Sequence, residues 1–398
     1  MRLMALHTSF YLLALLAATL VAHDVQASPL AVRIGYIGWT PDRGPVLSNV
    51  IPEPADAGLR GAELALADNN TTGRFLNQNY QLQVAAEAEL DATLDAARAL
   101  HADGVRLFVG NLPASALSQL SAEFSDSLLF NAGSYDDDLR TTQCLPNVLH
   151  TLPSRAMLAD ALGQFLLSRK LKRWLLISGP TADDNAYAAA LTRAAQRYGM
   201  RIVAQKEWSF ATDLRRAAQA EVPLFTQTDE YDVVLVADER GDFGEYIPYN
   251  TWYPRPVAGT QGLTPVGWHK TVETYGAAQL QKRFEAHAGR WMNSLDFAAW
   301  LAVRSVGAAV TTLKSDDAAQ IIALSLTDRL PMDGFKGRKL SYRRWNGQLR
   351  QPVALVQPRA LVSTSPQDGF LHPGTDLDTL GYDAPESQCR LALHLNQP

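Results

Sequence analysis

Residues able to do chemistry are few and scattered along this chain. The acidic run Asp136-Asp137-Asp138 offers oxygen ligands that a hard cation would accept. Acidic residues of this kind also commonly cap the turn that follows them, and we favour that interpretation. None of the eight histidines lies in a metal or nucleophile pattern, and no P-loop, GxGxxG, GxSxG, HExxH or CxxC motif occurs. We therefore expect a protein that is not an enzyme and that holds neither a metal nor a cofactor of its own.

The N-terminal residues predict export from the cytoplasm. Arg2 precedes the apolar run 10–22, and the small-residue pattern Val25-Gln26-Ala27 follows it. A positive start, a short apolar core and such a cleavage site are typical of a secretory signal peptide. Residues 1–27 are expected to be that signal peptide, with a membrane anchor as the alternative. The mature protein is then expected in the periplasm.

Export affects how the two cysteines are interpreted. Cys144 and Cys389 are far apart in the chain and form no zinc-type cluster. In an oxidising compartment, a disulfide that ties the C-terminal tail to the first half is the favoured interpretation. Two buried free thiols remain the alternative, because the sequence does not show whether the geometry of a disulfide is met.

Apolar runs and amphipathic segments alternate through the first 240 residues. Strands are expected at 32–38, 80–86, 106–109, 127–130, 173–177, 201–206 and 231–237, and helices at 58–70, 91–102, 114–124, 155–168 and 182–198. Alternation of this kind predicts βαβ units and parallel sheets. Because the pattern restarts after Leu152, we expect two similar α/β lobes rather than one large sheet.

The alternation of apolar runs and amphipathic segments stops after residue 240. An aromatic-rich irregular stretch over 241–268 is expected to be functional, because long loops in compact proteins usually are. Helices are expected at 271–287, 294–313 and 321–330. The turn Asn346-Gly347 predicts a hairpin within 337–362. Residues 363–398 are expected to form a tail that wraps the body.

The amino-acid composition disfavours some classes of binding partner. The chain has 398 residues, which suggests about two domains. Thirty-six basic and 41 acidic residues give a net charge of −5 and no basic surplus. Nucleic acid and anionic membranes are therefore not expected as partners.

Several segments carry a family resemblance when they are taken in order. They are GYIGWTP (35–41), GLRGAELALADNN (58–70), GVRLFVGNLPASALSQLS (104–121) and RWLLISGPTADDNAYAAALTRAAQRYGMRIV (173–203). Together they resemble type I periplasmic binding proteins of the leucine/isoleucine/valine-binding class, over about residues 31–362. The resemblance implies an α/β fold of two Rossmann-like lobes with parallel-sheet cores joined by three crossovers. It also implies a monomeric binding protein that closes on a small ligand for the membrane permease of an ABC transporter.

The resemblance also gives the expected lobe boundaries. Residues 28–153 with about 263–333 are expected in the N-terminal lobe, and residues 154–262 with about 334–362 in the C-terminal lobe. Trp39 and the aromatic residues near Trp252 and Trp268 depart from typical amino-acid binders. They resemble the branch encoded with pyrroloquinoline quinone (PQQ)-dependent alcohol dehydrogenase systems. That branch implies PQQ or a related planar anion as the ligand. The alternatives are an amino-acid-binding protein and a periplasmic ligand sensor for a membrane partner.

Candidate ligand residues follow from the expected fold, because ligands of open α/β sheets lie beyond the carboxyl ends of the strands. Aromatic faces could stack on a planar ligand, and arginines could pair with its carboxylates. The candidates are Trp39, Asn111, Ser134, Tyr135, Arg155, Asn185, Tyr187, Arg240, Trp252 and Trp268. For each tryptophan the alternative is core packing, and for each arginine it is a solvated surface charge.

Overall fold

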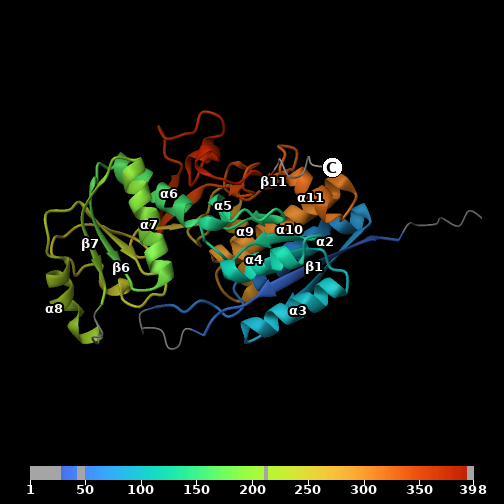
Figure 1. Cartoon of the computed structure of the whole chain (residues 1–398), viewed down its shortest axis with the longest axis horizontal. Coiled ribbons are helices and arrows are strands. Elements are labelled where there is room, and N and C mark those ends of the chain that lie inside the picture. The colour runs from blue at the N-terminus through green and yellow to red at the C-terminus, as the bar shows by residue number, and fades with distance from the viewer. Residues whose placement is uncertain (1–27, 43–49, 210–213, 392–398) are drawn as a thin grey trace, which may run out of the picture.

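The structure is a computed structural model that describes residues 28–42, 50–209 and 214–391. The predicted signal peptide, residues 1–27, lies outside these residues. Two lobes lie side by side along the long axis of the molecule (Figure 1). Within the described ranges, none of the helices combines the length and the apolar character needed to cross a bilayer.

The first lobe is built on a parallel sheet of five strands in the order β2-β1-β3-β4-β5. The strands are β1 (Leu30–Gly38), β2 (Gln78–Ala85), β3 (Leu107–Asn111), β4 (Leu128–Asn131) and β5 (Val148–His150). The helices of this lobe are α2 (Leu59–Leu76), α3 (Leu90–Ala102), α4 (Ala114–Glu123), α5 (Asp138–Thr141), α9 (Ala277–Ala288), α10 (Ser294–Leu313) and α11 (Ala318–Ser325).

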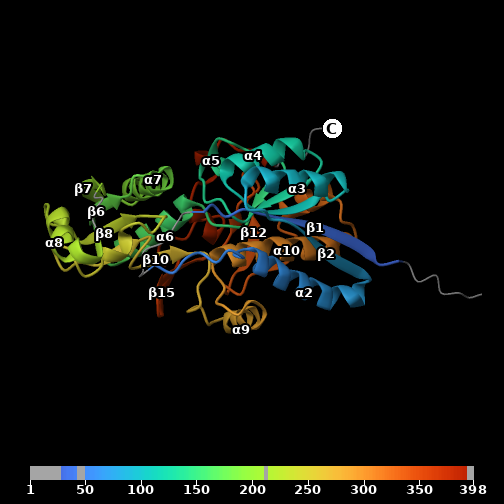
Figure 2. The same ribbon diagram turned by 90° about the horizontal axis from the view of Figure 1, so that it is seen from below.

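Helices cover both faces of this sheet, which explains why its strands are apolar on both sides. In β1, Val32, Ile34 and Tyr36 pack with α2 and α10, whereas Ile37 packs with α3 and α4 on the opposite face. Alternate side chains of a strand point to opposite faces, so a strand buried on both faces is a nearly continuous apolar run. Figure 2 shows α3 and α4 on one side of β1, and α2, α9 and α10 on the other.

The second lobe repeats this arrangement. Its parallel sheet has the order β7-β6-β8-β9. The strands are β6 (Arg173–Ser178), β7 (Arg201–Glu207), β8 (Val233–Ala237) and β9 (Val257–Gly259), and the helices are α6 (Arg155–Ser168), α7 (Ala182–Arg197), α8 (Leu214–Thr226) and the 3-10 turn η1 (Gly244–Tyr246). In β6, Trp174 and Leu176 face α6 and α7, whereas Leu175 and Ile177 face α8. The two-lobed α/β fold that the alternating pattern predicts is thus confirmed.

Short antiparallel sheets lie where the chain passes between the lobes. They are β11 (Met332–Asp333) with β12 (Lys339–Tyr342) and β13 (Leu349–Arg350), and β14 (Val353–Gln357) with β10 (Thr264–Val266) and β15 (Ala360–Ser365). The predicted Asn346-Gly347 turn lies between β12 and β13. The region 337–362 holds a second hairpin, β14–β15, that the sequence did not reveal. Leu340 and Leu349 pack in the first core and Val353 in the second, so the chain crosses between the lobes just before β14.

The tail beyond β15 contacts both lobes. Residues 376–379 and 384–386 form the 3-10 turns η2 (Asp376–Thr379) and η3 (Ala384–Glu386). The backbone N–H of Gly381 donates to Asp160 of α6 at 2.8 Å. Cys389 is buried and forms a disulfide with Cys144, close to α5 of the first lobe. The tail therefore joins the second-lobe helices to the first lobe.

Candidate functional site

The carboxyl ends of the two parallel sheets meet where the first crossover enters α6. In Figure 1, β1 runs toward the second lobe. The loop after β4 carries Tyr135, whose carbonyl oxygen accepts the backbone N–H of Arg155 at 3.0 Å. Arg155 begins α6, and the Ser154 hydroxyl caps that helix by accepting the N–H of Met157. Loops of both lobes thus converge at the start of α6.

The centre of this convergence is an ion-pair network in which Arg155 is buried, Glu239 is partly buried and Asp183 is exposed. Arg155 is 6% exposed and donates to both carboxylate oxygens of Glu239, at 2.7 and 2.8 Å. It also donates to Asp183 at 2.7 Å. Glu239 follows β8, and Asp183 lies in the first turn of α7, so three elements of the second lobe place these groups together. We call Arg155, Glu239 and Asp183 the Arg155 cluster.

Burial and ion pairing shift the pKa values of Arg155 and Glu239 in opposite directions. Burial raises the pKa of Glu239 above its ordinary value, although hydrogen bonds from Arg155 act against that shift. Burial lowers the pKa of Arg155, but the Glu239 carboxylate raises it more, and the net shift is upward. One guanidinium faces two carboxylates, so the cluster carries a formal charge of −1. A ligand group that donates hydrogen bonds or carries positive charge would complement it better than another anion would.

Two tyrosines lie beside the Arg155 cluster. Tyr135 comes from the first lobe, and Tyr187 of α7 is 3% exposed. Burial raises the pKa of both phenols, and Glu239 raises both further while Arg155 opposes it. Both therefore stay neutral hydroxyls at physiological pH.

Polar side chains fix the first-lobe loop that carries Tyr135. Asn131 at the end of β4 accepts the N–H groups of Gly133 at 3.2 Å and of Ser134 at 2.8 Å. Arg140 donates to the carbonyls of Ser134 at 3.0 Å and Asp136 at 2.6 Å, and burial lowers its pKa to about 10. These contacts hold Ser134 and Tyr135 at the edge that faces the second lobe.

The acidic run after Tyr135 acts as a cap. Asp136 accepts the N–H of Asp138 at 2.8 Å, and both oxygens of Asp137 accept the N–H of Ala156 in α6, each at 3.1 Å. Among the described residues, no group of three or more His, Cys, Asp or Glu side chains is placed to hold a metal ion. Asp137 instead bonds a first-lobe loop to the start of a second-lobe helix.

The three predicted tryptophans do not gather at this site. Trp39 follows β1, and its ring N–H donates to the carbonyl of Ala88 at 3.1 Å, across the end of β2. Trp268 is 2% exposed and stacks on Phe297 at 4.4 Å between centroids, within the first core. Trp252 is 45% exposed, and its backbone N–H donates to Thr226 at the end of α8. That place is beside the start of β8 rather than its carboxyl end.

Three other predicted residues, Asn111, Asn185 and Arg240, each bond a partner outside the Arg155 cluster. Asn111 ends β3, and its amide donates to the carbonyl of Ala57 at 3.2 Å. Asn185 is exposed and donates to the carbonyl of Thr181 at 3.0 Å. Arg240 is exposed and pairs with Asp242 at 3.3 Å. Of the predicted residues, the structure brings Tyr135, Arg155 and Tyr187 together.

The start of α7 is capped by side chains of its own first turn. Thr181 and Asp184 form a capping box, and Asp184 also accepts the N–H of Glu239 at 2.7 Å. Asp183 and Asp184 both lie in the first turn. Acidic residues there offset the positive end of the helix dipole and disfavour a bound anion.

Sequence reasoning missed Glu239 and Asp183, the two partners of Arg155. Glu239 stands two residues after the buried run Val233–Ala237, at the carboxyl end where ligand residues are expected. That position could have identified Glu239 as a candidate ligand residue from the sequence. Asp183 had no comparable signal, because acidic residues are common in the first turn of any helix.

Comparisons with known proteins give a consistent result. The family model described as "Periplasmic binding protein" matches residues 32–361. No curated protein matches the chain.

Solved structures share the fold at low sequence identity. A branched chain amino acid ABC transporter periplasmic ligand-binding protein from Burkholderia xenovorans LB400 has a TM-score of 0.72 and 18% identity, and the match covers 91% of this chain and all 100% of that one. The leucine-, isoleucine-, valine-, threonine-, and alanine-binding protein from Brucella ovis, in a closed conformation, has a TM-score of 0.64 and 14% identity over 88% of this chain and 93% of that one. A solute binding protein of an ABC transporter from R. palustris, in complex with benzoate, has a TM-score of 0.62 and 14% identity over 83% and 95%.

Proposed function

This chain belongs to the periplasmic binding protein family, and on that premise we propose that its two lobes close on a small ligand for an ABC transporter. The family consists of substrate-binding proteins rather than enzymes, and its name places it in the periplasm. The resemblance to the leucine-binding class is thereby confirmed at the level of the family.

The observation that carries the proposal is the Arg155 cluster at the carboxyl ends of both sheets. Tyr135 of the first lobe binds the backbone of Arg155, and Arg155 binds Glu239 of the second lobe. A ligand between the lobes would contact groups from both, and its binding energy would favour the closed arrangement. The membrane permease is the expected partner of that closed form.

The charge of the cluster supports a ligand that carries an amino group. Glu239 and Asp183 outnumber Arg155, so an ammonium group would balance the site. An amino acid has such a group, and its carboxylate could bind N–H and hydroxyl donors of the first-lobe loops. The printed names of two similar structures are those of amino-acid-binding proteins. We therefore propose an amino acid or a related small amine as the first ligand class.

PQQ or a related planar anion is the second ligand class that we propose. The partly buried ring of Tyr135, whose phenol feels the charge of Arg155, would offer a stacking face to a flat aromatic ligand. A carboxylate of PQQ would have to take the place of Asp183 on Arg155, since that guanidinium is already paired. The acidic first turn of α7 opposes this exchange.

A thermal-shift experiment separates the two classes. The mature protein is titrated with the twenty amino acids, with small amines and with PQQ, and each hit is confirmed by calorimetry. Ligand at 100 times its Kd should stabilise the folded state by about 2.7 kcal/mol. Stabilisation by an amino acid that Glu239→Gln weakens at least tenfold supports the first class, and stabilisation by PQQ alone supports the second. Absence of any response from the whole panel at millimolar concentration contradicts both.

A further inference from the structure

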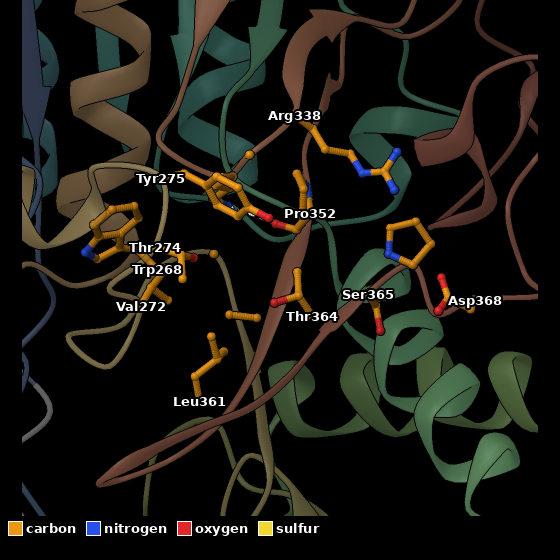
Figure 3. Close-up of a pocket in the computed structure, with 15 residues that line it drawn as sticks. Trp268, Val272, Thr274, Tyr275, Arg338, Pro352, Leu361, Thr364, Ser365 and Asp368 are labelled. Carbon is orange, nitrogen blue, oxygen red and sulfur yellow. Dashed lines mark hydrogen bonds between the residues drawn. The ribbon is translucent and has the colours of Figure 1, made fainter.

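A cavity of about 530 Å³ lies among the crossovers, and none of its lining residues belongs to the Arg155 cluster. One wall is the segment between β10 and α9, which carries Trp268, Val272 and Tyr275. The opposite wall is the β14–β15 hairpin. Figure 3 shows Tyr275 directed toward Pro352, and Thr274 and Thr364 on the two walls. A volume of this size suits a small organic molecule.

The cavity contains a lysine whose charge has no acidic partner. Lys336, between β11 and β12, donates from Nζ to the side-chain oxygen of Gln351 at 2.7 Å and to the carbonyl of Pro352 at 2.9 Å. Its ammonium also lies over the Phe297 ring, at 4.8 Å from the centroid. Within the described part of the chain, Lys336 has no carboxylate to balance it, and burial alone lowers its pKa to about 7.

Neutral hydrogen-bond acceptors and an aromatic face only partly compensate a half-buried cation. Water is a better solvent for an ammonium group than two carbonyl oxygens and a ring are, so this arrangement costs free energy unless an anion enters. Arg338 also lines the cavity, but it is paired with Asp376 of the tail. Lys336 is therefore the cation that remains for an incoming anion.

The other walls combine apolar and polar groups. Val272, Pro352 and Leu361 provide apolar surface and Tyr275 an aromatic ring, whereas Thr364, Ser365 and Asp368 make the rest of the lining polar. The Asp368 carboxylate would repel an anion, so the carboxylate has to bind at the Lys336 end of the cavity. The Tyr275 ring can lie close to the backbone because residue 337 is glycine: a Cβ there would lie 2.5 Å from the ring. An apolar body with a single carboxylate would satisfy both Lys336 and these walls.

We propose that this crossover cavity is a second ligand site, which binds a small organic carboxylate with an apolar body through Lys336. The site shares no residue with the Arg155 cluster, so it does not depend on which ligand the lobes close on. Its walls come from two different crossovers: Trp268 packs in the first core, and β14 lies on α6 of the second lobe. A bound carboxylate would connect these segments and would thereby bias the opening of the lobes.

The test compares a carboxylate with its neutral isostere. Cyclohexanecarboxylate and cyclohexanecarboxamide are titrated into the full mature protein at about pH 6, where Lys336 is mostly protonated, and binding is measured by calorimetry and ligand-observed NMR. We expect the carboxylate to bind with a Kd below a few millimolar and the carboxamide at least tenfold more weakly. Equal affinity for the two compounds, or no binding of the carboxylate at ten millimolar, would overturn the proposal.

Two variants locate the binding. Lys336→Met removes the ammonium from the cavity, and Lys339→Met makes the same change at an exposed neighbour that bonds the carbonyl of Asp328. The carboxylate should lose at least tenfold in affinity in Lys336→Met and less than twofold in Lys339→Met. Unchanged affinity in a folded Lys336→Met protein would place the ligand elsewhere. If Lys336→Met does not fold, Lys336→Gln takes its place. The comparison of carboxylate and carboxamide binding to the wild type tests the proposal without any variant.

Discussion

Replacing Arg155 by methionine should leave the partly buried Glu239 without its guanidinium partner. The guanidinium is 6% exposed and makes two hydrogen bonds to that carboxylate. Removing one partner of a buried ion pair typically costs about 3–5 kcal/mol, because the other charge is left uncompensated. We expect a loss of this size in the free energy of unfolding, measured by urea denaturation at pH 7.5 with tryptophan fluorescence.

The double variant Arg155→Met/Glu239→Gln makes the prediction sharper. It removes the uncompensated charge, so it should be more stable than Arg155→Met alone, although it differs from the wild type at one position more. If the double variant is instead less stable than Arg155→Met by the full cost of Glu239→Gln alone, the two residues are not coupled, and the argument for the Arg155 cluster fails.

The pH dependence supplies an independent check on the same variants. The folded-state pKa of Glu239 is raised, so the folded protein holds this proton more tightly than the unfolded chain does. Stability from this group is therefore present at low pH and lost as the pH rises through the folded pKa. The deficit of Arg155→Met should be largest near pH 8 and should shrink toward pH 5. A deficit that grows on acidification would refute the assignment.

Three further predictions concern the tail and the outlying tryptophan. Reducing the Cys144–Cys389 disulfide, which closes a loop with a sequence separation of 245, should lower stability by about 2–5 kcal/mol, and dithiothreitol should not affect a Cys144→Ser/Cys389→Ser variant. Asp160→Asn should cost about 3 kcal/mol and expose the tail to limited proteolysis, because buried Asp160 binds Arg193 and the Gly381 amide; a tail as resistant as in the wild type would contradict this. Trp252→Ala should change neither ligand affinity nor stability by more than about 0.5 kcal/mol, since Trp252 is half exposed and distant from the cluster; a tenfold loss of binding would place it in the site.

The sequence predicted the fold well because its signals are local. The apolar run ending at Gly38 and its counterpart Arg173–Ser178 are buried on both faces, and such strands are easy to recognise. The hairpin β14–β15 escaped notice because neither Asn-Gly nor Asp-Gly marks its turn, which is formed by Pro358 and Arg359. The helix predicted at 271–287 starts six residues later, at Ala277, because Gly276 before it has a left-handed backbone conformation.

The site was harder to predict because its residues meet only in three dimensions. Arg155 was a candidate from its place at the start of a helix, but the carboxylates that bind it are 28 and 84 residues away in sequence. Trp252 and Trp268 were predicted as ligand residues because of their residue type. Residue type does not distinguish a ring in the core from one that contacts a ligand. Lys336 of the crossover cavity had no sequence signal, since its environment comes from the residues between β13 and β14, from α10 and from the loop before α9.

The central claim is that a small ligand binds between the lobes at the Arg155 cluster. A crystal structure of the mature protein with the strongest ligand from the titration panel tests it most directly. We predict ligand density within hydrogen-bond distance of Glu239 or Arg155 and in contact with Tyr135, with the two lobes enclosing it. Density for that ligand only outside this region, with the Arg155 cluster unchanged and in contact with solvent, would contradict the claim.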